Sequence, residues 1–238
     1  MIYRGCPILK DAKKIFFNAE TCKTSKVSVV LRSEMEPQEK ILKTALELFF
    51  RYGIRHVTMD EIARELGMSK KTIYQFFREK DDLVNQLLDV ELQEKECEFE
   101  ELTGQSKDAV HEMLLISAKM REMMQGINPM FFLDLQKFYA SGFKRFQKFK
   151  EECGYENVVR NMKKGIEQGL YRDDLDVEIV ARYRMAQLDM IMFGNYYSFE
   201  RHSLARIHEE TLHIFMYGIC NIKGHKLINQ YKKIRDVE

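Results

Sequence analysis

Apolar residues recur at helical spacing along almost the whole chain from residue 37 onward. The first clear stripe consists of Ile41, Leu42, Ala45, Leu48 and Phe49. These positions share one face of a helix with 3.6 residues per turn. Gly53 suits the end of that helix, because glycine tolerates the positive φ found after a last helical turn. Alternation of polar and apolar residues never lasts long enough to predict a strand, so the pattern predicts an all-α fold.

Capping residues and glycines divide the rest of the pattern into further helices. Thr58 with Glu61 forms a capping box that starts a second helix at about residues 59–66. Ser69 caps a short third helix that ends near Phe77. We expect six more helices at about residues 82–102, 106–125, 130–141, 143–168, 176–195 and 203–221.

The same pattern divides the chain into four segments. Residues 1–34 carry seven basic and three acidic side chains and show no sustained period. Met35 leads directly into the first helix. We therefore expect residues 1–34 to be either a disordered extension or a stretch that does not belong to the native protein. The other segments are a first helical domain at 35–82, a larger helical domain at 83–225, and a tail at 226–238.

Composition narrows the class of protein. The chain has 238 residues, 45% hydrophobic and 32% charged, with only 3 prolines and a net charge of +1. This profile is typical of a globular protein, and a local basic surface is needed for any binding of nucleic acid. No apolar run approaches the ~18 residues of a membrane span. Five cysteines at unpaired spacings suggest free thiols in a reducing cytoplasm.

Residues 58–77 read TMDEIARELGMSKKTIYQFF and show the spacing of a helix-turn-helix. Ala63 must be small, because the following helix crosses close above it. Gly67 supplies the positive φ of the turn, and Ile73 buries the junction between the two helices. A chance helical hairpin can mimic this spacing, so the flanking residues matter.

With its flanks, the chain resembles the TetR family of bacterial regulators over about residues 38–84, most closely in the run SKKTIYQFFREKDDL. The matching positions are Ala45, Leu48, Phe49, Gly53, Thr58, Ile62, Ala63, Gly67, Ser69, Thr72, Tyr74, Phe77, Lys80 and Leu83. The resemblance implies an N-terminal three-helix helix-turn-helix domain and a C-terminal helical bundle for dimerisation and ligand binding. Lys71 stands where many members have Gly, and Phe76 stands where Tyr or His is common.

The third helix is expected to enter the major groove of DNA. Gln75 can pair with adenine, and Lys70 or Lys71 with guanine. The resemblance implies that Thr58, Tyr74 and Lys80 grip the phosphate backbone. The complete set of predicted DNA-binding residues is Thr58, Ser69, Lys70, Lys71, Thr72, Tyr74, Gln75 and Lys80. The competing interpretation is a solvated basic face, with Tyr74 packed in the core.

The body is rich in methionine and phenylalanine, which suits either an ordinary core or an apolar ligand cavity. The resemblance favours a cavity that takes a small apolar effector. Its predicted lining is Met120, Phe131, Phe138, Phe143, Met162 and Met185.

The eighth and ninth predicted helices, 176–195 and 203–221, are apolar on more than one side. Such helices need cover on two faces, which either a large core or a homodimer interface provides. The resemblance favours the dimer. The string HEETLH places His208 and His213 five residues apart, whereas zinc binding on one helical face needs a spacing of four. We therefore expect no metal site and no cofactor.

The predicted function is a cytoplasmic, nucleoid-associated transcriptional repressor rather than an enzyme. A homodimer would bind a palindromic operator with half-sites ~34 Å apart and leave it when an effector tilts the fourth helix. One alternative is a similar DNA binder controlled by a partner protein or lacking an effector, which a body without a cavity would favour. The other is an unrecognised enzyme, which convergent titratable residues in a cleft would favour.

Overall fold

The computed structural model describes residues 36–194 and 196–235. Helices account for nearly all of this part, and a single isolated bridge joins Tyr171 to Cys220 without forming a strand. The all-α prediction is confirmed. Residues 1–34, which we expected to form an extension, lie outside the described residues.

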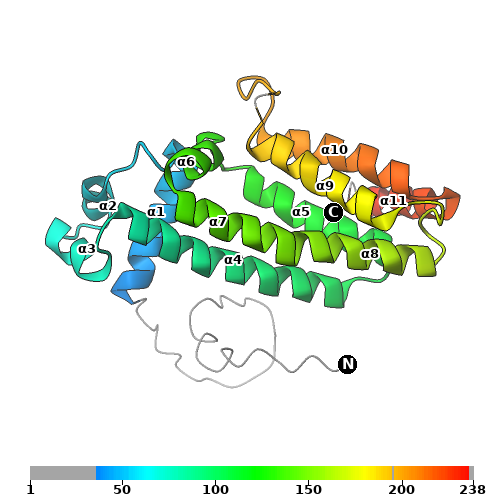
Figure 1. Cartoon of the computed structure of the whole chain (residues 1–238), viewed down its shortest axis with the longest axis horizontal. Coiled ribbons are helices and arrows are strands. Elements are labelled where there is room, and N and C mark those ends of the chain that lie inside the picture. The colour runs from blue at the N-terminus through cyan, green and yellow to red at the C-terminus, as the bar shows by residue number, and fades with distance from the viewer. Residues whose placement is uncertain (1–35, 195, 236–238) are drawn as a thin grey trace, which may run out of the picture.

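Three helices pack together at one end of the elongated molecule, to the left in Figure 1. They are α1 (Pro37–Tyr52), α2 (Met59–Glu65) and α3 (Lys70–Phe76). Leu42 and Leu48 of the predicted stripe are partly buried against the shared core. The buried members of this core include three residues of that stripe and three of the helix-turn-helix: Ile41, Ala45, Phe49, Ile62, Ala63 and Ile73.

The predicted signals for helix ends are confirmed in this domain. The Thr58 hydroxyl accepts the backbone N–H of Glu61, and the Glu61 carboxylate accepts the N–H of Thr58. Ser69 caps α3 by accepting the N–H of Thr72. Gly67 has a φ of 63°, as the turn requires. Local sequence therefore fixes the geometry between α2 and α3.

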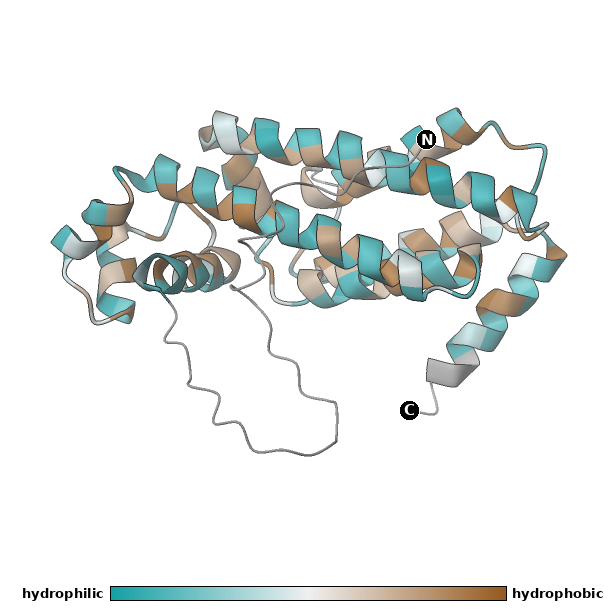
Figure 2. Cartoon of the chain, turned by 90° about the horizontal axis from the view of Figure 1, so that it is seen from below, coloured by the Kyte–Doolittle hydropathy of each residue, from teal (hydrophilic) through white to brown (hydrophobic). Residues whose placement is uncertain are grey.

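The remaining helices form a long body (Figure 1). The helix α4 runs along this body. The helix α7, the π-helical segment η3 and the helix α8 follow one another in the same direction along the body. Their bounds are α4 (Lys80–Gln105), α5 (Ala109–Met124), α6 (Met130–Phe138), α7 (Ala140–Phe149), η3 (Lys150–Tyr155), α8 (Glu156–Glu167), α9 (Val177–Met192), α10 (Leu204–Ile219) and α11 (Ile222–Arg235). Figure 2 shows hydrophilic and hydrophobic residues alternating along these helices, as expected for helices around a shared core.

The structure differs from the sequence expectation at three places. The single helix expected at 143–168 consists of the end of α7, η3 and α8, with the wide π turns placed around Gly154. The segment expected to be a tail is helical as far as Arg235, because α11 packs against α5 and the Tyr231 hydroxyl donates to Asp108. The domain boundary expected at residue 82 falls inside α4.

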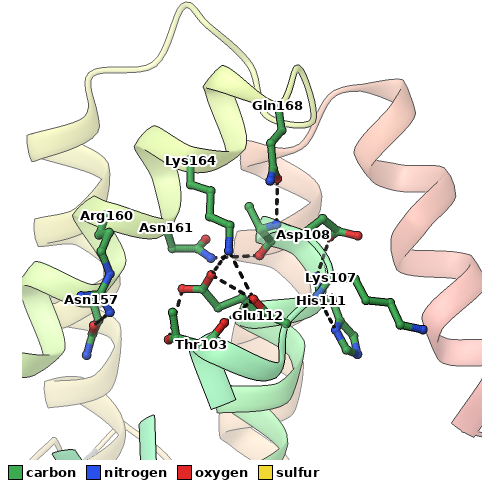
Figure 3. Close-up of polar contacts among 12 residues, drawn as sticks. Thr103, Lys107, Asp108, His111, Glu112, Asn157, Arg160, Asn161, Lys164 and Gln168 are labelled. Carbon is green, nitrogen blue, oxygen red and sulfur yellow. Dashed lines mark hydrogen bonds and ion pairs between the residues drawn. The ribbon is translucent and has the colours of Figure 1, made fainter. Parts of the chain in front are cut away.

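A buried polar cluster ties together the end of the body farthest from α3 (Figure 3). Glu112 on α5 is almost fully buried, and its carboxylate receives the Lys164 ammonium at 2.6 Å. Lys164 also donates to the Ser106 hydroxyl, and Asn161 donates to the carbonyl of Ala109. Because the buried carboxylate is paired, the cluster holds α8 against α5 instead of offering a free charge.

Candidate functional sites: a DNA-reading helix and a cavity in the body

The helix α3 presents a polar face to solvent. Lys70, Lys71, Tyr74 and Gln75 are exposed, while Ile73 between them is fully buried and fixes the helix on α2. Tyr74 is 42% exposed, so core packing does not explain this ring. The arrangement suits the reading of base edges in a major groove.

Three predicted contact residues are already engaged with neighbours. The Ser69 and Thr72 hydroxyls lie 2.8 Å apart, and both belong to the cap of α3. The Lys70 ammonium pairs with Asp60 at 2.7 Å, and this pairing raises the lysine pKa. Both partners are more than half exposed, and water and salt screen such surface pairs strongly. A DNA phosphate can therefore replace Asp60 at little cost.

Lys80 is less exposed than Thr58 and Tyr74, the other predicted phosphate contacts. Its side chain is half-buried, and its ammonium donates to the carbonyl of Ile54 at 2.5 Å and that of Arg55 at 3.4 Å. Burial lowers the pKa of Lys80, with a partial offset from Asp134. In this arrangement Lys80 secures the α1–α2 loop, and contact with a phosphate requires it to leave those carbonyls.

No local sequence pattern indicates the contact between α6 and the α1–α2 loop. The buried Asp134 carboxylate on α6 accepts the backbone N–H of Arg55 at 2.8 Å. The Arg55 guanidinium lies over the Phe138 ring at 4.6 Å from its centroid. Gly53 is required here, because a Cβ would lie 3.1 Å from Asp134 Oδ2 at a φ of 84°. Thus α6 joins the body to the DNA-reading domain.

A cavity of about 150 Å³ lies inside the body, between α4, α5, η3, α8 and α9. Its lining is mainly apolar and rich in methionine: Met113, Met120, Met123, Met124, Met185 and Met192. Two of the six residues predicted to line it, Met120 and Met185, do so.

The other four predicted lining residues lie elsewhere. Phe131 packs edge-on against Phe50, and Phe143 packs edge-on against Phe193. Met162 is fully buried in the core away from the cavity surface, and Phe138 is 51% exposed. Periodicity identified the apolar side of each helix but not which part of that side faces the cavity.

Sequence reasoning missed Arg184, a buried arginine on α9 that lines the cavity. Its guanidinium donates to His208 Nε2 at 3.1 Å and to Gln187 Oε1 at 3.3 Å. Burial, together with the charge of Arg184, lowers the pKa of His208 to about 3. The ring is therefore neutral at physiological pH and a poor general base there.

His208 and His213, from the HEETLH string, have separate surroundings. His208 faces Arg184, whereas His213 lies near Lys232 and Tyr217. Within the described part of the chain, no group of three metal-binding side chains comes together. In the same part, no helix is long and apolar enough to cross a membrane.

Comparison with known proteins agrees with this geometry. Residues 41–87 match the model of the family described as bacterial regulatory proteins, tetR family. The chain is 21% identical over 184 residues to the fatty acid metabolism regulator protein of Bacillus subtilis (strain 168), which covers 76% of this chain and 95% of that protein.

Solved structures share the fold. A TetR-family transcriptional regulator from Agrobacterium tumefaciens aligns with a TM-score of 0.65 at 17% identity, over 77% of this chain and 97% of that one. The transcriptional regulator FadR from Bacillus subtilis, solved in complex with stearoyl-CoA, aligns with a TM-score of 0.58 at 17% identity, over 76% and 98% of the two chains.

Proposed function

We propose that the chain is a ligand-released repressor of the tetR family of bacterial regulatory proteins, whose model matches residues 41–87. As a homodimer it binds a palindromic operator through α3 of each protomer. A small apolar or amphipathic ligand enters the body and releases the DNA. The observation that carries the DNA-binding part is the exposed polar face of α3, held on the buried Ile73.

A homodimer through α9 and α10, the eighth and ninth helices of the sequence prediction, is supported by the apolar side chains that these helices expose. Ile179 and Tyr183 lie one turn apart on α9 and are 68% and 56% exposed. On α10, Ile214 is 69% exposed and Tyr217 is 37% exposed. Exposed apolar side chains grouped on two adjacent helices favour burial against a second copy.

The cavity and the relatives support a ligand. Cavities of about 150 Å³ bind molecules the size of benzene, and flexible methionine side chains can make room for longer ones. One relative regulates fatty acid metabolism by name, and one structural neighbour was solved with stearoyl-CoA. The cavity and these two relatives together favour a ligand with an apolar chain.

The route from ligand to DNA is proposed to include α6 as well as α4. The cavity lining includes Ile127 and Phe132, which flank the start of α6. A ligand that moves them also moves Asp134, whose carboxylate holds the α1–α2 loop. A coupling free energy of about 1–3 kcal/mol between the two sites is enough for regulation.

The test is fluorescence anisotropy of the purified protein with a duplex from upstream of its own gene, at several salt concentrations. Tyr74→Ala should weaken binding at least about tenfold, because the ring is exposed on α3. Tyr196→Ala, at an exposed tyrosine in the segment between α9 and α10, is the control.

Binding equal to that of random duplex, followed by a genome-wide footprint without sites, would overturn the DNA-reading function. Operator binding that no small molecule relieves, but that a bound protein does, would favour the partner-controlled alternative.

A further inference from the structure

The cavity contains a buried positive charge that lacks a negative partner. Arg184 is only 3% exposed, and across the described residues no carboxylate lies within ion-pair distance of it. The other two cations in the lining differ: Lys95 pairs with Glu98 at 2.9 Å, and Lys150 pairs with Asp189 at 2.6 Å. Arg184 is thus the one cation of this lining without an acid.

Burying an unpaired charge is costly, which makes this arrangement informative. Burial lowers the pKa of Arg184 to about 10, so the guanidinium still keeps its proton at neutral pH. The Phe215 ring, 5.5 Å from the guanidinium carbon, gives a cation–π contact but does not neutralise the charge. An anion at this point would recover electrostatic free energy that the ligand-free protein lacks.

The neighbours of Arg184 are neutral groups that accept its hydrogen bonds. An arginine can only donate, so His208 Nε2 accepts and the proton of the neutral ring resides on Nδ1, on the far side of the ring from the guanidinium. Among the described residues this buried Nδ1 has no hydrogen-bond partner. Gln187 directs its carbonyl oxygen toward the guanidinium. Both partners leave the positive charge uncompensated, and an anionic acceptor from the cavity would match it.

The rest of the cavity lining favours an anion that carries an apolar chain. Besides the methionines, Phe99, Phe149 and Leu188 line it. A ligand that satisfies both parts has one small anionic head and an otherwise apolar chain. The volume of about 150 Å³ is too small for a nucleotide-containing group such as coenzyme A.

We propose that the body binds a free monocarboxylic acid, with its carboxylate paired to Arg184 and its apolar chain among the methionines. This deepens the proposed function and rests on its ligand response. A thioester replaces the carboxylate by a neutral carbonyl, so the site distinguishes a free acid from its coenzyme A ester.

The test is a titration of the full chain, with isotope-labelled methionine methyl groups, followed by NMR. The probes are octanoate, octanol and octanoyl-CoA. Octanoate should bind at least about tenfold more tightly than octanol, the size of one charge-assisted hydrogen bond. Arg184→Met should remove this preference, so that octanoate and octanol bind about equally, and Arg184→Lys should keep part of it. Arg182→Met, an exposed arginine on the same helix, is the matched control.

The preference for octanoate persisting in a folded Arg184→Met protein would overturn the carboxylate site. Wild-type protein that binds octanol or octanoyl-CoA as tightly as octanoate would do the same. Operator binding is measured separately by anisotropy. Octanoate that binds through Arg184 without releasing DNA would leave this inference standing and contradict the proposed release mechanism.

Discussion

Lys70 and Lys80 carry the same ammonium group, but their different burial gives them different roles. Lys70 is exposed on α3 and pairs with an exposed carboxylate, so its charge remains available to DNA. Lys80 is half-buried and holds the Ile54 carbonyl. A short motif places both residues in the family pattern, yet only their burial separates a mobile surface cation from a loop anchor.

We predict that Lys70→Ala weakens DNA binding about equally on all sequences and lowers the slope of log affinity against log salt by about one. Lys80→Met should instead lower the free energy of unfolding by about 1–2 kcal/mol, because the loop carbonyls lose their donor. Anisotropy across a salt series and urea unfolding check the two outcomes. A reduced salt slope in Lys80→Met without loss of stability would show that Lys80 contacts phosphate.

His208 makes stability depend on pH. Its pKa falls from 6.5 to about 3 on folding. The unfolded chain therefore binds the extra proton between these values, and this contribution to stability is lost as pH falls through that window. At pH 5 the loss is about 2 kcal/mol relative to pH 7. Urea unfolding of His208→Gln should lack this part of the pH dependence.

The control for this prediction is the wild-type protein under the same conditions, because Glu91 opposes the effect. Burial raises the pKa of Glu91 to about 7, so its contribution to stability grows as pH falls below that value. An identical pH dependence in wild type and His208→Gln would contradict the assignment to His208.

The helix α6 contacts both the α1–α2 part of the protein and the body. Asp134 accepts the N–H of Arg55, and Asn128, which precedes α6, donates its own N–H to the carbonyl of Phe50 at 2.6 Å. Both hydrogen bonds join α6 or the residue before it to the end of α1 and the α1–α2 loop. Since the start of α6 also borders the cavity, this short helix is placed to transmit a change between the two sites.

We predict that Asp134→Ala speeds hydrogen exchange at the Arg55 amide and weakens the release of DNA by ligand, with little effect on operator affinity without ligand. Removing the acceptor leaves the part-buried Arg55 N–H without this partner, at a cost of about 1 kcal/mol. Asp134→Asn, which keeps an acceptor oxygen, is the matched control. Normal ligand release in Asp134→Ala would exclude α6 from the coupling.

At the scale of the whole molecule, α9 has one side toward the cavity and another toward solvent. Arg184, Met185 and Leu188 face the cavity, while Ile179 and Tyr183 face solvent. This accounts for a helix that is apolar nearly all round: one side completes the core, and the other is available to a second copy.

We predict that Ile214→Glu shifts the protein to monomers and weakens operator binding at least about tenfold, since a palindrome is read by two protomers. Sedimentation velocity measures the oligomeric state. Tyr52→Glu, an exposed apolar residue in the reading domain, should leave the state unchanged. A wild-type monomer, or an Ile214→Glu dimer, would contradict an interface through α10.

The sequence by itself determined the helices and the reading motif. The Thr58 and Ser69 caps and the Gly67 turn depend on atoms within a few residues of one another, so local spacing is sufficient to predict them. The same is true of the buried face of α1 and of the two-sided apolar character of α9 and α10, because helical periodicity assigns residues to faces.

Only the tertiary structure decided what those faces meet. Arg184 meets His208 across 24 residues, and Arg55 meets Asp134 across 79. No local pattern records either pair, because burial and partner come from packing between helices. The same packing placed Phe131, Phe138, Phe143 and Met162 away from the cavity and put an unpaired guanidinium on its wall. Sequence thus specified the helices and their apolar sides, and long-range packing turned those sides into a core, a cavity and a charge.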